Sequence, residues 1–388
     1  DSVLRVKCGS VIADLFSIQA EYAISSVLQQ LHEEENGVEA DTSDSAPKAS
    51  TDSSASSPKV KDLASRFRFG EDADPVWKEK FTARLLTYVD VFNQLDFDIG
   101  RTDVIHDIEL TPGPAVRERP RPIPPQDFEE VRQHIQQLLD ANIIKPSTSP
   151  FASPIVLVRK KNGALRMCID YRRINARTVR DSYALPKIED LFRTLSGSKF
   201  FTSVDLSKAY YQVPLSERAK KISAFATPFG LYEFERLSFG LVNAPMTFQR
   251  LMEQCFRDMN LVELIIFLDD VLIHAETLEE LEERTIKVLE RLRRFKLKLD
   301  PDKCMFCATE VKHLGFLISG EGIRPDPEKT EALRSWPVPT TVKEVKAFVG
   351  FAGYYRRFVS HFSHMAKPLN DLTIGYIPRG TAKKGGKV

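Results

Sequence analysis

Hydrophobic and polar positions change their periodicity several times along the chain, which predicts a mixture of helices and strands. Residues 128–139 place apolar side chains on one helical face, and residues 248–259 and 278–299 do the same. Between them, two strand-like runs in residues 155–171 flank Asn162-Gly163, a pair typical of a two-residue hairpin turn. The pattern therefore predicts an α+β fold in which helices pack on one face of a sheet.

Carboxylates interrupt or end two of the apolar runs. Residues 199–206 form an apolar, β-branched run that ends near Asp205, and residues 262–275 read as strand, tight turn and strand around Asp269-Asp270. An acidic surface turn explains the adjacent pair equally well. A third carboxylate at another strand end favours a shared site, provided that the sheet brings the ends together. Such a set of oxygen ligands suits Mg²⁺ and two-metal phosphoryl transfer.

The remainder of the chain separates into segments of different character. Residues 41–58 are Ser-rich and nearly free of large apolar groups, which indicates a disordered linker. Asp326-Pro327 fits a helix N-cap followed by proline, and Thr341 with Glu344 fits a capping box, so a small helical domain is expected near the end. The expected segments are a leader (1–75), an extended Pro-rich lead-in (76–120), a central region (121–321), the helical domain (322–373) and a disordered tail (374–388).

Composition adds a preference for a polyanionic partner. The chain has 388 residues and a net charge of +1, of which residues 1–75 contribute −7 and residues 76–388 contribute +8. No apolar run is long enough to span a bilayer and no secretory leader is seen, so an intracellular protein (cytoplasm or nucleus) without a membrane partner is expected. Cys304 and Cys307 form a lone CxxC, which is read as two buried small residues in preference to a zinc site.

Three stretches, in order, resemble successive motifs of reverse transcriptases. They are residues 201–213 (FTSVDLSKAYYQV), 239–249 (FGLVNAPMTFQ) and 267–270 (FLDD). The sequences of these motifs are most similar to those of the Pol polyproteins of gypsy-class LTR retrotransposons, which are related to retroviral polymerases. The similarity runs from about residue 120 to 373. The resemblance implies a right-hand polymerase in which residues 121–321 form the fingers and an antiparallel palm sheet packed on helices, with 322–373 as the thumb.

The resemblance also implies roles for individual residues. The catalytic metal ligands would be Asp205, Asp269 and Asp270, holding two Mg²⁺ ions with Mn²⁺ as a substitute. The nucleotide site would be formed by Lys160, Lys161, Arg166, Tyr210, Phe239 and Gly240. Primer and template would contact Asn243, Pro245, Gln249, Leu314 and Gly315. Lys303 is considered both as a proton donor to pyrophosphate and as an ordinary surface lysine.

Several readings of function stay open. The first is an RNA-directed DNA polymerase of an LTR retroelement, which joins dNTPs to a primer 3′-hydroxyl on an RNA or DNA template. The second is a catalytically silent, truncated remnant that binds nucleic acid. The third is an RNA-synthesising polymerase, disfavoured because Tyr210 would exclude a ribose 2′-hydroxyl. Phe267 departs from the Tyr that is usual there, and no RNase H domain is expected in this chain. The sequence does not indicate an oligomeric state.

Overall fold

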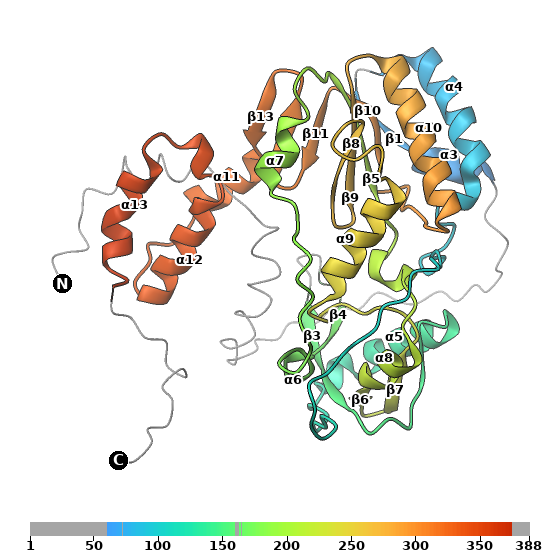
Figure 1. Ribbon diagram of the computed structural model, residues 1–388, viewed down its shortest axis with the longest axis vertical. Helices are drawn as coiled ribbons and strands as arrows, with labels where there is room; N and C mark the ends of the chain where they lie inside the picture. Colours follow the sequence, from blue (N-terminus) through green and yellow to red (C-terminus); the bar gives the residue numbers. More distant parts are fainter. Residues whose placement is uncertain (1–59, 72, 160–162, 164, 375–388) are drawn as a thin grey trace. The chain divides into compact units, whose positions relative to one another are not determined.

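The computed structural model describes residues 60–71, 73–159, 163 and 165–374 (Figure 1). Contacts divide the chain into a larger unit, Ser56–Val311, and a smaller unit that includes Lys312–Val388. Some predicted features lie outside the described residues, namely the Ser-rich linker at 41–58, Lys160, Lys161 and the tail from residue 375 onward.

A five-stranded sheet, here called the palm sheet, forms the centre of the larger unit with strand order β1-β10-β5-β9-β8. Its strands are β1 (Arg68–Phe69), β5 (Phe200–Asp205), β8 (Leu264–Phe267), β9 (Asp270–Ala275) and β10 (Met305–Ala308). Neighbouring strands run antiparallel, except that β1 pairs in parallel with β10. The expected antiparallel sheet is confirmed, with one short parallel strand added at its edge.

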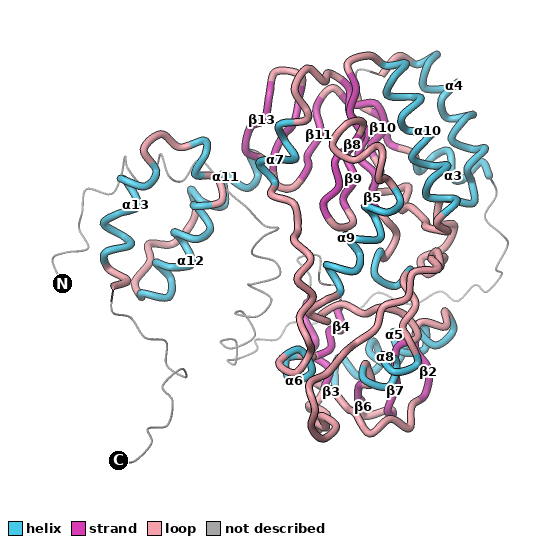
Figure 2. Tube along the Cα trace, viewed as in Figure 1, coloured by secondary structure: helices cyan, strands magenta, loops and turns pink. Residues whose placement is uncertain are grey.

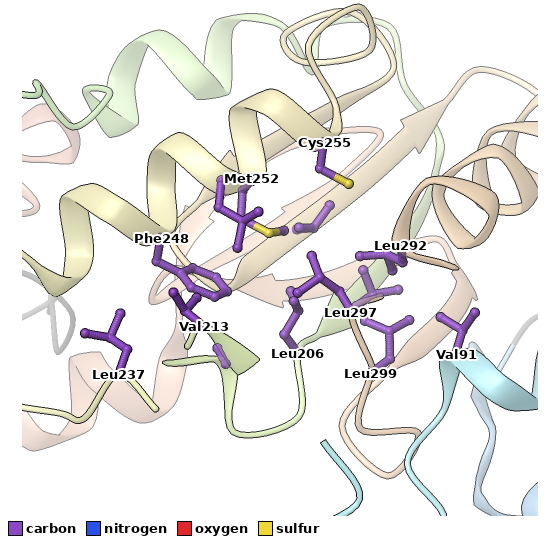
Figure 3. Close-up of a cluster of buried hydrophobic side chains, with 14 of the residues drawn as sticks. Val91, Leu206, Val213, Leu237, Phe248, Met252, Cys255, Leu292, Leu297 and Leu299 are labelled. Carbon is purple, nitrogen blue, oxygen red and sulfur yellow. The ribbon is translucent and has the colours of Figure 1, made fainter. Parts of the chain in front are cut away.

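Two long helices, α9 (Ala244–Cys255) and α10 (Leu278–Arg294), pack against the palm sheet. Figure 3 shows Phe248, Met252 and Cys255 of α9 gathered with Leu206 and Leu292, and all five are at most 1% exposed. The α9 residues are four and three positions apart, so they share one helical face. The helical spacing predicted for this part of the sequence is therefore confirmed, and burial of that face holds the helix on the sheet.

A second five-stranded sheet, here called the fingers sheet, has the order β2-β7-β6-β3-β4. Its strands are β2 (Ile144–Pro146), β3 (Ser153–Arg159), β4 (Leu165–Ile169), β6 (Phe225–Thr227) and β7 (Gly230–Phe234). Arg159 pairs with Leu165, which confirms the predicted hairpin. Gly163, within the hairpin loop, has φ +80°, the left-handed conformation that glycine adopts without strain.

Further helices belong to the larger unit (Figure 2). They are η3 (Pro125–Asp127), α5 (Phe128–Asp140), α6 (Arg172–Asn175), α7 (Ile188–Arg193), η4 (Ala209–Gln212) and α8 (Glu217–Ile222). Helix α5 buries Val131, Ile135 and Leu138, which confirms its predicted apolar face. In the described part of the chain, no helix has the length and apolar content needed to cross a membrane.

Residues 60–92 differ from the sequence-based expectation of a leader followed by an extended lead-in. They form α3 (Val60–Arg66), strand β1, α4 (Pro75–Leu85) and η2 (Leu86–Val91). The ring of Phe67 lies 4.9 Å from that of Phe92 and 5.7 Å from that of Phe306 on β10. These aromatic residues have no clear period in the sequence, because each packs on a distant strand instead of forming one continuous face.

The smaller unit begins ten residues before the thumb boundary expected at 322. It contains the three-stranded sheet β11-β12-β13 and a helical segment. The elements are β11 (Glu310–His313), β12 (Phe316–Ser319), β13 (Gly322–Pro325), α11 (Pro327–Arg334), α12 (Val342–Gly353), η5 (Arg356–Phe358) and α13 (Phe362–Asp371). Both predicted helix starts are confirmed: Asp326 caps α11, and Thr341 with Glu344 forms a capping box on α12.

Candidate active site

Three carboxylates meet at one end of the palm sheet. Strands β5 and β9 run antiparallel with Asp205 directly opposite Asp270, and Asp269 lies in the turn between β8 and β9. Directly opposed residues in antiparallel strands have Cα atoms about 4.5–5.5 Å apart. The sheet therefore brings together two carboxylate-bearing segments that are far apart in the sequence, which was the condition on which the predicted site depended.

A buried side chain from α9 holds the β8–β9 turn. Leu268 has φ +56°, a conformation that residues other than glycine rarely adopt. Its amide N–H donates to Gln249 Oε1 at 2.7 Å, and Gln249 Nε2 donates to Glu253 Oε1 at 2.8 Å. Gln249 has no exposed surface, so it does not reach a primer or template as the sequence analysis expected. It positions the turn that carries Asp269.

Lys303 places a positive charge beside the carboxylates. Its Nζ lies 2.9 Å from Asp205 Oδ1 and 3.9 Å from Asp300 Oδ2. Burial acts to lower the pKa of Lys303, but the charge and hydrogen bond of Asp205 outweigh it and raise the pKa above its ordinary value. Both readings offered for Lys303 stay open, because its side chain is 58% exposed and yet is paired with a candidate catalytic group.

Burial raises the pKa of all three aspartates. The rise is largest at Asp270, whose pKa reaches about 7 because the negative charges of Asp269 and Asp205 add to the effect of burial. At Asp205 the charge of Lys303 opposes the rise. The three carboxyls thus share one electrostatic environment, in which further positive charge favours the ionised form of each.

The donor atoms suit a hard divalent cation. Carboxylate oxygens are the protein ligands that Mg²⁺ prefers, and the backbone pairing supplies three carboxylates at one edge. Among the residues that the structure describes, no three acidic, histidine or cysteine side chains already converge as a coordination shell. One Asp205 oxygen is held by Lys303. The residues fit the cation by their chemistry.

A chain of contacts links the fingers sheet to the carboxylates. The guanidinium of Arg166, on β4, lies 5.6 Å from the centre of the Phe239 ring, and that ring lies 4.9 Å from the ring of Tyr210. Burial, and then the charge of Asp269, raises the pKa of Tyr210. Phe239 is 42% exposed. The structure therefore brings together Arg166, Phe239 and Tyr210 of the predicted nucleotide site and leaves an aromatic face open.

The loop after Phe239 is held by a residue that the sequence analysis missed. Asn175 Nδ2 donates to Gly240 O at 2.8 Å, and Val242 N donates to Asn175 Oδ1 at 3.0 Å. Gly240 has φ +90°, and a Cβ there would lie 3.3 Å from Ile169 O on β4. The position thus requires glycine both for its conformation and for this close approach. A single asparagine at the end of a four-residue helix gives no periodic signal from which its role could be predicted.

Asn243 and Pro245 begin helix α9, beside this loop. Asn243 Nδ2 donates to Val179 O at 2.8 Å, and Asn243 Oδ1 accepts from Asp181 N at 3.1 Å. Asp181 in turn pairs with Arg250 at 2.6 Å. The carboxamide of Asn243 is therefore engaged with the backbone. Asp181 and Arg250, which the sequence analysis did not select, extend this polar cluster along α9.

Leu314 and Gly315 belong to the smaller unit. Leu314 is buried, and its carbonyl accepts from the Tyr354 hydroxyl at 3.0 Å, while Gly315 O accepts from Tyr355 at 2.9 Å. These bonds fix the β11–β12 turn on the helices of its own unit. Their expected contact with a primer stays a prediction.

Cys304 and Cys307 are both buried in the larger unit. Burial raises the pKa of both thiols, that of Cys307 to about 11, so neither favours the thiolate that binds zinc. Cys304 Sγ donates to the Asp300 carbonyl. The interpretation of this CxxC as two buried small residues is confirmed.

Part of the chain matches a known family, and most of it is similar to known polyproteins. Residues 158–318 match the family model described as reverse transcriptase (RNA-dependent DNA polymerase). The Pol polyprotein of transposon 297 from Drosophila melanogaster is 34% identical over 300 residues, covering 75% of this chain and 28% of the relative. That of transposon opus is 37% identical over 264 residues, covering 67% of this chain and 26% of the relative. The chain thus spans about a quarter of the length of these relatives.

Solved structures support the same fold. The foamy viral protease-reverse transcriptase in complex with double-stranded DNA superposes with a TM-score of 0.73 at 23% identity, covering 82% of this chain and 67% of that one. The same viral protein with an RNA/DNA hybrid gives a TM-score of 0.72 at 23% identity, covering 82% of this chain and 43% of that one. Together, the comparisons show that the chain is similar to LTR retrotransposon Pol polyproteins and that its residues 158–318 match the reverse transcriptase family model.

Proposed function

We propose that this chain catalyses RNA-directed DNA synthesis, adding deoxynucleotides to a primer 3′-hydroxyl with release of pyrophosphate. The observation that carries the proposal is the pairing of Asp205 with Asp270 across β5 and β9, with Asp269 in the adjoining turn. Three carboxylates at one sheet edge match the requirement of phosphoryl transfer for positioning and charge neutralisation. The relatives that support this activity are polyproteins several times longer, so it is inferred for this chain from its own residues.

Asp205, Asp269 and Asp270 are the residues that would hold two Mg²⁺ ions, with Mn²⁺ as a substitute. When bound, such ions activate the attacking hydroxyl and stabilise the leaving oxygen. The raised pKa values of the aspartates are consistent with a site that ionises fully only beside added positive charge. Lys303 supplies part of that charge at Asp205.

The incoming nucleotide would lie between the fingers sheet and the carboxylates. Arg166 would bind the triphosphate, because a guanidinium presents several donors to phosphate oxygens. Tyr210, backed by Phe239 at 4.9 Å and by Phe248 at 5.6 Å, would form the wall under the sugar. Gly240 would allow the backbone to approach the nucleotide. Lys160 and Lys161, which follow Arg159 in the sequence, would add charge near the triphosphate.

We infer a primed RNA or DNA template as the macromolecular partner. The foamy viral enzyme is known in complexes with double-stranded DNA and with an RNA/DNA hybrid, which supports this partner class for a similar fold. Asn243 and Pro245 would face the template, and Leu314 with Gly315 would serve the primer from the thumb. Binding should rest mainly on phosphates, so it should weaken steeply with salt and depend little on sequence.

The test is primer extension by the purified chain on an RNA template with dNTPs, with and without Mg²⁺. Synthesis should require the metal and should be lost in Asp269→Asn. Asp258→Asn is the matched control, because it makes the same change at an exposed aspartate that pairs with Arg291 away from the site. Salt-sensitive template binding without extension by the unsubstituted chain would contradict the proposed activity and favour a silent remnant.

A further inference from the structure

Arg66, at the end of helix α3, binds two parts of the larger unit at once. Its Nε and Nη2 donate to Asp302 Oδ2 at 3.0 and 2.7 Å. Its Nη1 and Nη2 donate to Asn93 O and Oδ1 at 2.8 and 3.0 Å. All the donor nitrogens of the guanidinium are thus used, in the planar fork geometry that distinguishes arginine from lysine. The residue lies well upstream of residues 158–318, which match the family model.

The position of Arg66 follows from the edge of the palm sheet. Strand β1 begins two residues after Arg66 and pairs in parallel with β10, with Arg68 opposite Met305. Counting back along both strands places Arg66 beside the residues just before β10. The register of this short parallel pair therefore fixes which residues the arginine meets, although Asp302 is 236 residues away in the sequence.

Arg66 binds the turn at residues 300–303, and this turn is hydrogen-bonded to the strand that carries Asp205. Asp300 N donates to Asp205 O at 3.0 Å, so the start of the turn is bonded to the end of β5. Lys303 N and Cys304 N both donate to Asp300 O, at 3.1 and 3.2 Å, and these bonds close the turn. From the closed turn, Lys303 Nζ reaches Asp205 Oδ1 at 2.9 Å.

Asn93, the second partner of Arg66, is also bonded to residues next to Asp205 and next to the 300–303 turn. Asn93 is 5% exposed, its N–H donates to Leu299 O at 2.9 Å, and its Nδ2 donates to Ser207 Oγ at 2.9 Å. Ser207 lies two residues after Asp205, and its N–H donates to Lys298 O at 2.9 Å. Arg66 and Asn93 together therefore brace the 300–303 turn and the backbone just before it.

Charge gives this brace a second effect. Asp300 and Asp302 add two carboxylates close to Asp205, and their mutual repulsion would push the turn outward. Arg66 offsets Asp302 directly and lies 3.8 Å from Asp300 Oδ1, while Lys303 serves Asp205. Without Arg66, Asp300 would lose a nearby cation, so Lys303, which lies 3.9 Å from Asp300 and 2.9 Å from Asp205, would be drawn more toward Asp300 and held less firmly on Asp205.

We propose that Arg66 is a positioning residue for the active site, holding the 300–303 turn so that Lys303 stays on Asp205. Residues 60–93 are then part of the catalytic palm and not a separate leader. The positioning itself is a property of the fold, and its effect on synthesis rests on the proposed function.

A matched variant separates positioning from simple attachment of the upstream segment. Arg293 on α10 also binds this segment with several bonds: its Nε donates to Asp90 Oδ2 at 2.7 Å, and its Nη2 donates to Thr87 O at 2.8 Å. These bonds lead to η2 and not to the 300–303 turn. Arg293→Met therefore loosens the same segment, whereas Arg66→Met removes the brace on the turn as well.

The first measurement is amide hydrogen exchange of the metal-free chain at Asp300, Lys303 and Cys304. Charge-assisted hydrogen bonds contribute about 1.5 kcal/mol or more, so Arg66→Met should speed exchange at these amides about tenfold, and Arg293→Met should leave them unchanged. Asp302→Asn should speed exchange as Arg66→Met does. The double variant should exchange little faster than either single variant, because both substitutions weaken the same Arg66–Asp302 contact. Equal exchange at the turn in the Arg66→Met and Arg293→Met variants would overturn the proposal.

The second measurement is single-turnover extension on a primed RNA template. Arg66→Met should lower the maximal rate about tenfold with unchanged template affinity, and Arg66→Lys should recover part of the loss because it keeps the charge but not the fork. A loss confined to template affinity would overturn the catalytic part of the proposal. Failure of the unsubstituted chain to extend would contradict the proposed function instead, and the exchange result would still decide whether Arg66 positions the turn.

Discussion

The two turns that border the carboxylates are held in place by different physical means. The β8–β9 turn is fixed by Gln249, an uncharged side chain with no exposed surface, through its bond to Leu268 N. The 300–303 turn is fixed by Arg66 and Lys303, whose partners are carboxylates. A buried neutral hydrogen bond is insensitive to salt, whereas partly exposed ion pairs are weakened by it. The site thus combines one rigid side, held by a buried bond, with one side whose ion pairs respond to salt.

The rigid side should show the larger response to substitution. Gln249→Leu leaves the Leu268 N–H without its acceptor, which costs about 1–3 kcal/mol, and allows the turn carrying Asp269 to shift. A displacement of about 1 Å at a reacting group can reduce a rate on the order of 10²-fold, so extension should fall by about that factor. Thermal unfolding and single-turnover extension would be measured together.

Gln254→Leu is the control for this change, because Gln254 lies on the same helix with its side chain exposed. It should keep both stability and rate. If Gln249→Leu extended primers as fast as the unsubstituted chain, the turn would not depend on the buried bond and the contrast between the two turns would disappear.

The pH dependence of stability should have opposite signs at the two turns. The pKa of Asp270 is raised from 3.8 to about 7 in the folded chain, so its contribution is present at low pH and is lost as the pH rises through about 7. The pKa of Asp302 is lowered, first by its hydrogen bond from Arg66, so its contribution is present above the ordinary aspartate pKa and is lost as the pH falls. The Asp302 effect is the smaller, because that side chain is half exposed.

Urea unfolding of the metal-free chain, in a chelating buffer between about pH 3 and pH 8, checks both signs. Asp270→Asn should remove the loss of stability on the alkaline side, and Asp302→Asn should reduce the loss on the acid side. The same pH profile for both variants would contradict the different origins assigned to the two turns.

Much of the palm could be predicted because its signals are local. Asp205 and Asp269-Asp270 adjoin apolar strand runs, and antiparallel pairing brings such ends together. The N-caps at Asp326 and Thr341 depend on residues within a few positions, so they were predicted correctly. The α9 face was visible from its spacing.

The supporting residues could not be predicted, because their partners are distant in the sequence. Asn175 meets Gly240 across 65 positions, and Arg66 meets Asp302 across 236. Gln249 was placed at the primer or template from its motif alone. No pattern indicated that its side chain is buried, because a glutamine counts as a polar position in a helical pattern whether it faces solvent or the protein interior. Burial of an amide of this kind is decided by the turn that it supports.

The proposed activity requires Asp205 to act as a catalytic group and not as a structural one. Single-turnover primer extension by Asp205→Asn, with template binding measured on the same preparation, tests this claim. Asparagine keeps the size of the side chain and removes the charge, so synthesis should fall on the order of a thousandfold or more while template affinity is nearly unchanged. Extension within a few fold of the unsubstituted chain, at equal template affinity, would contradict the assignment of the active site.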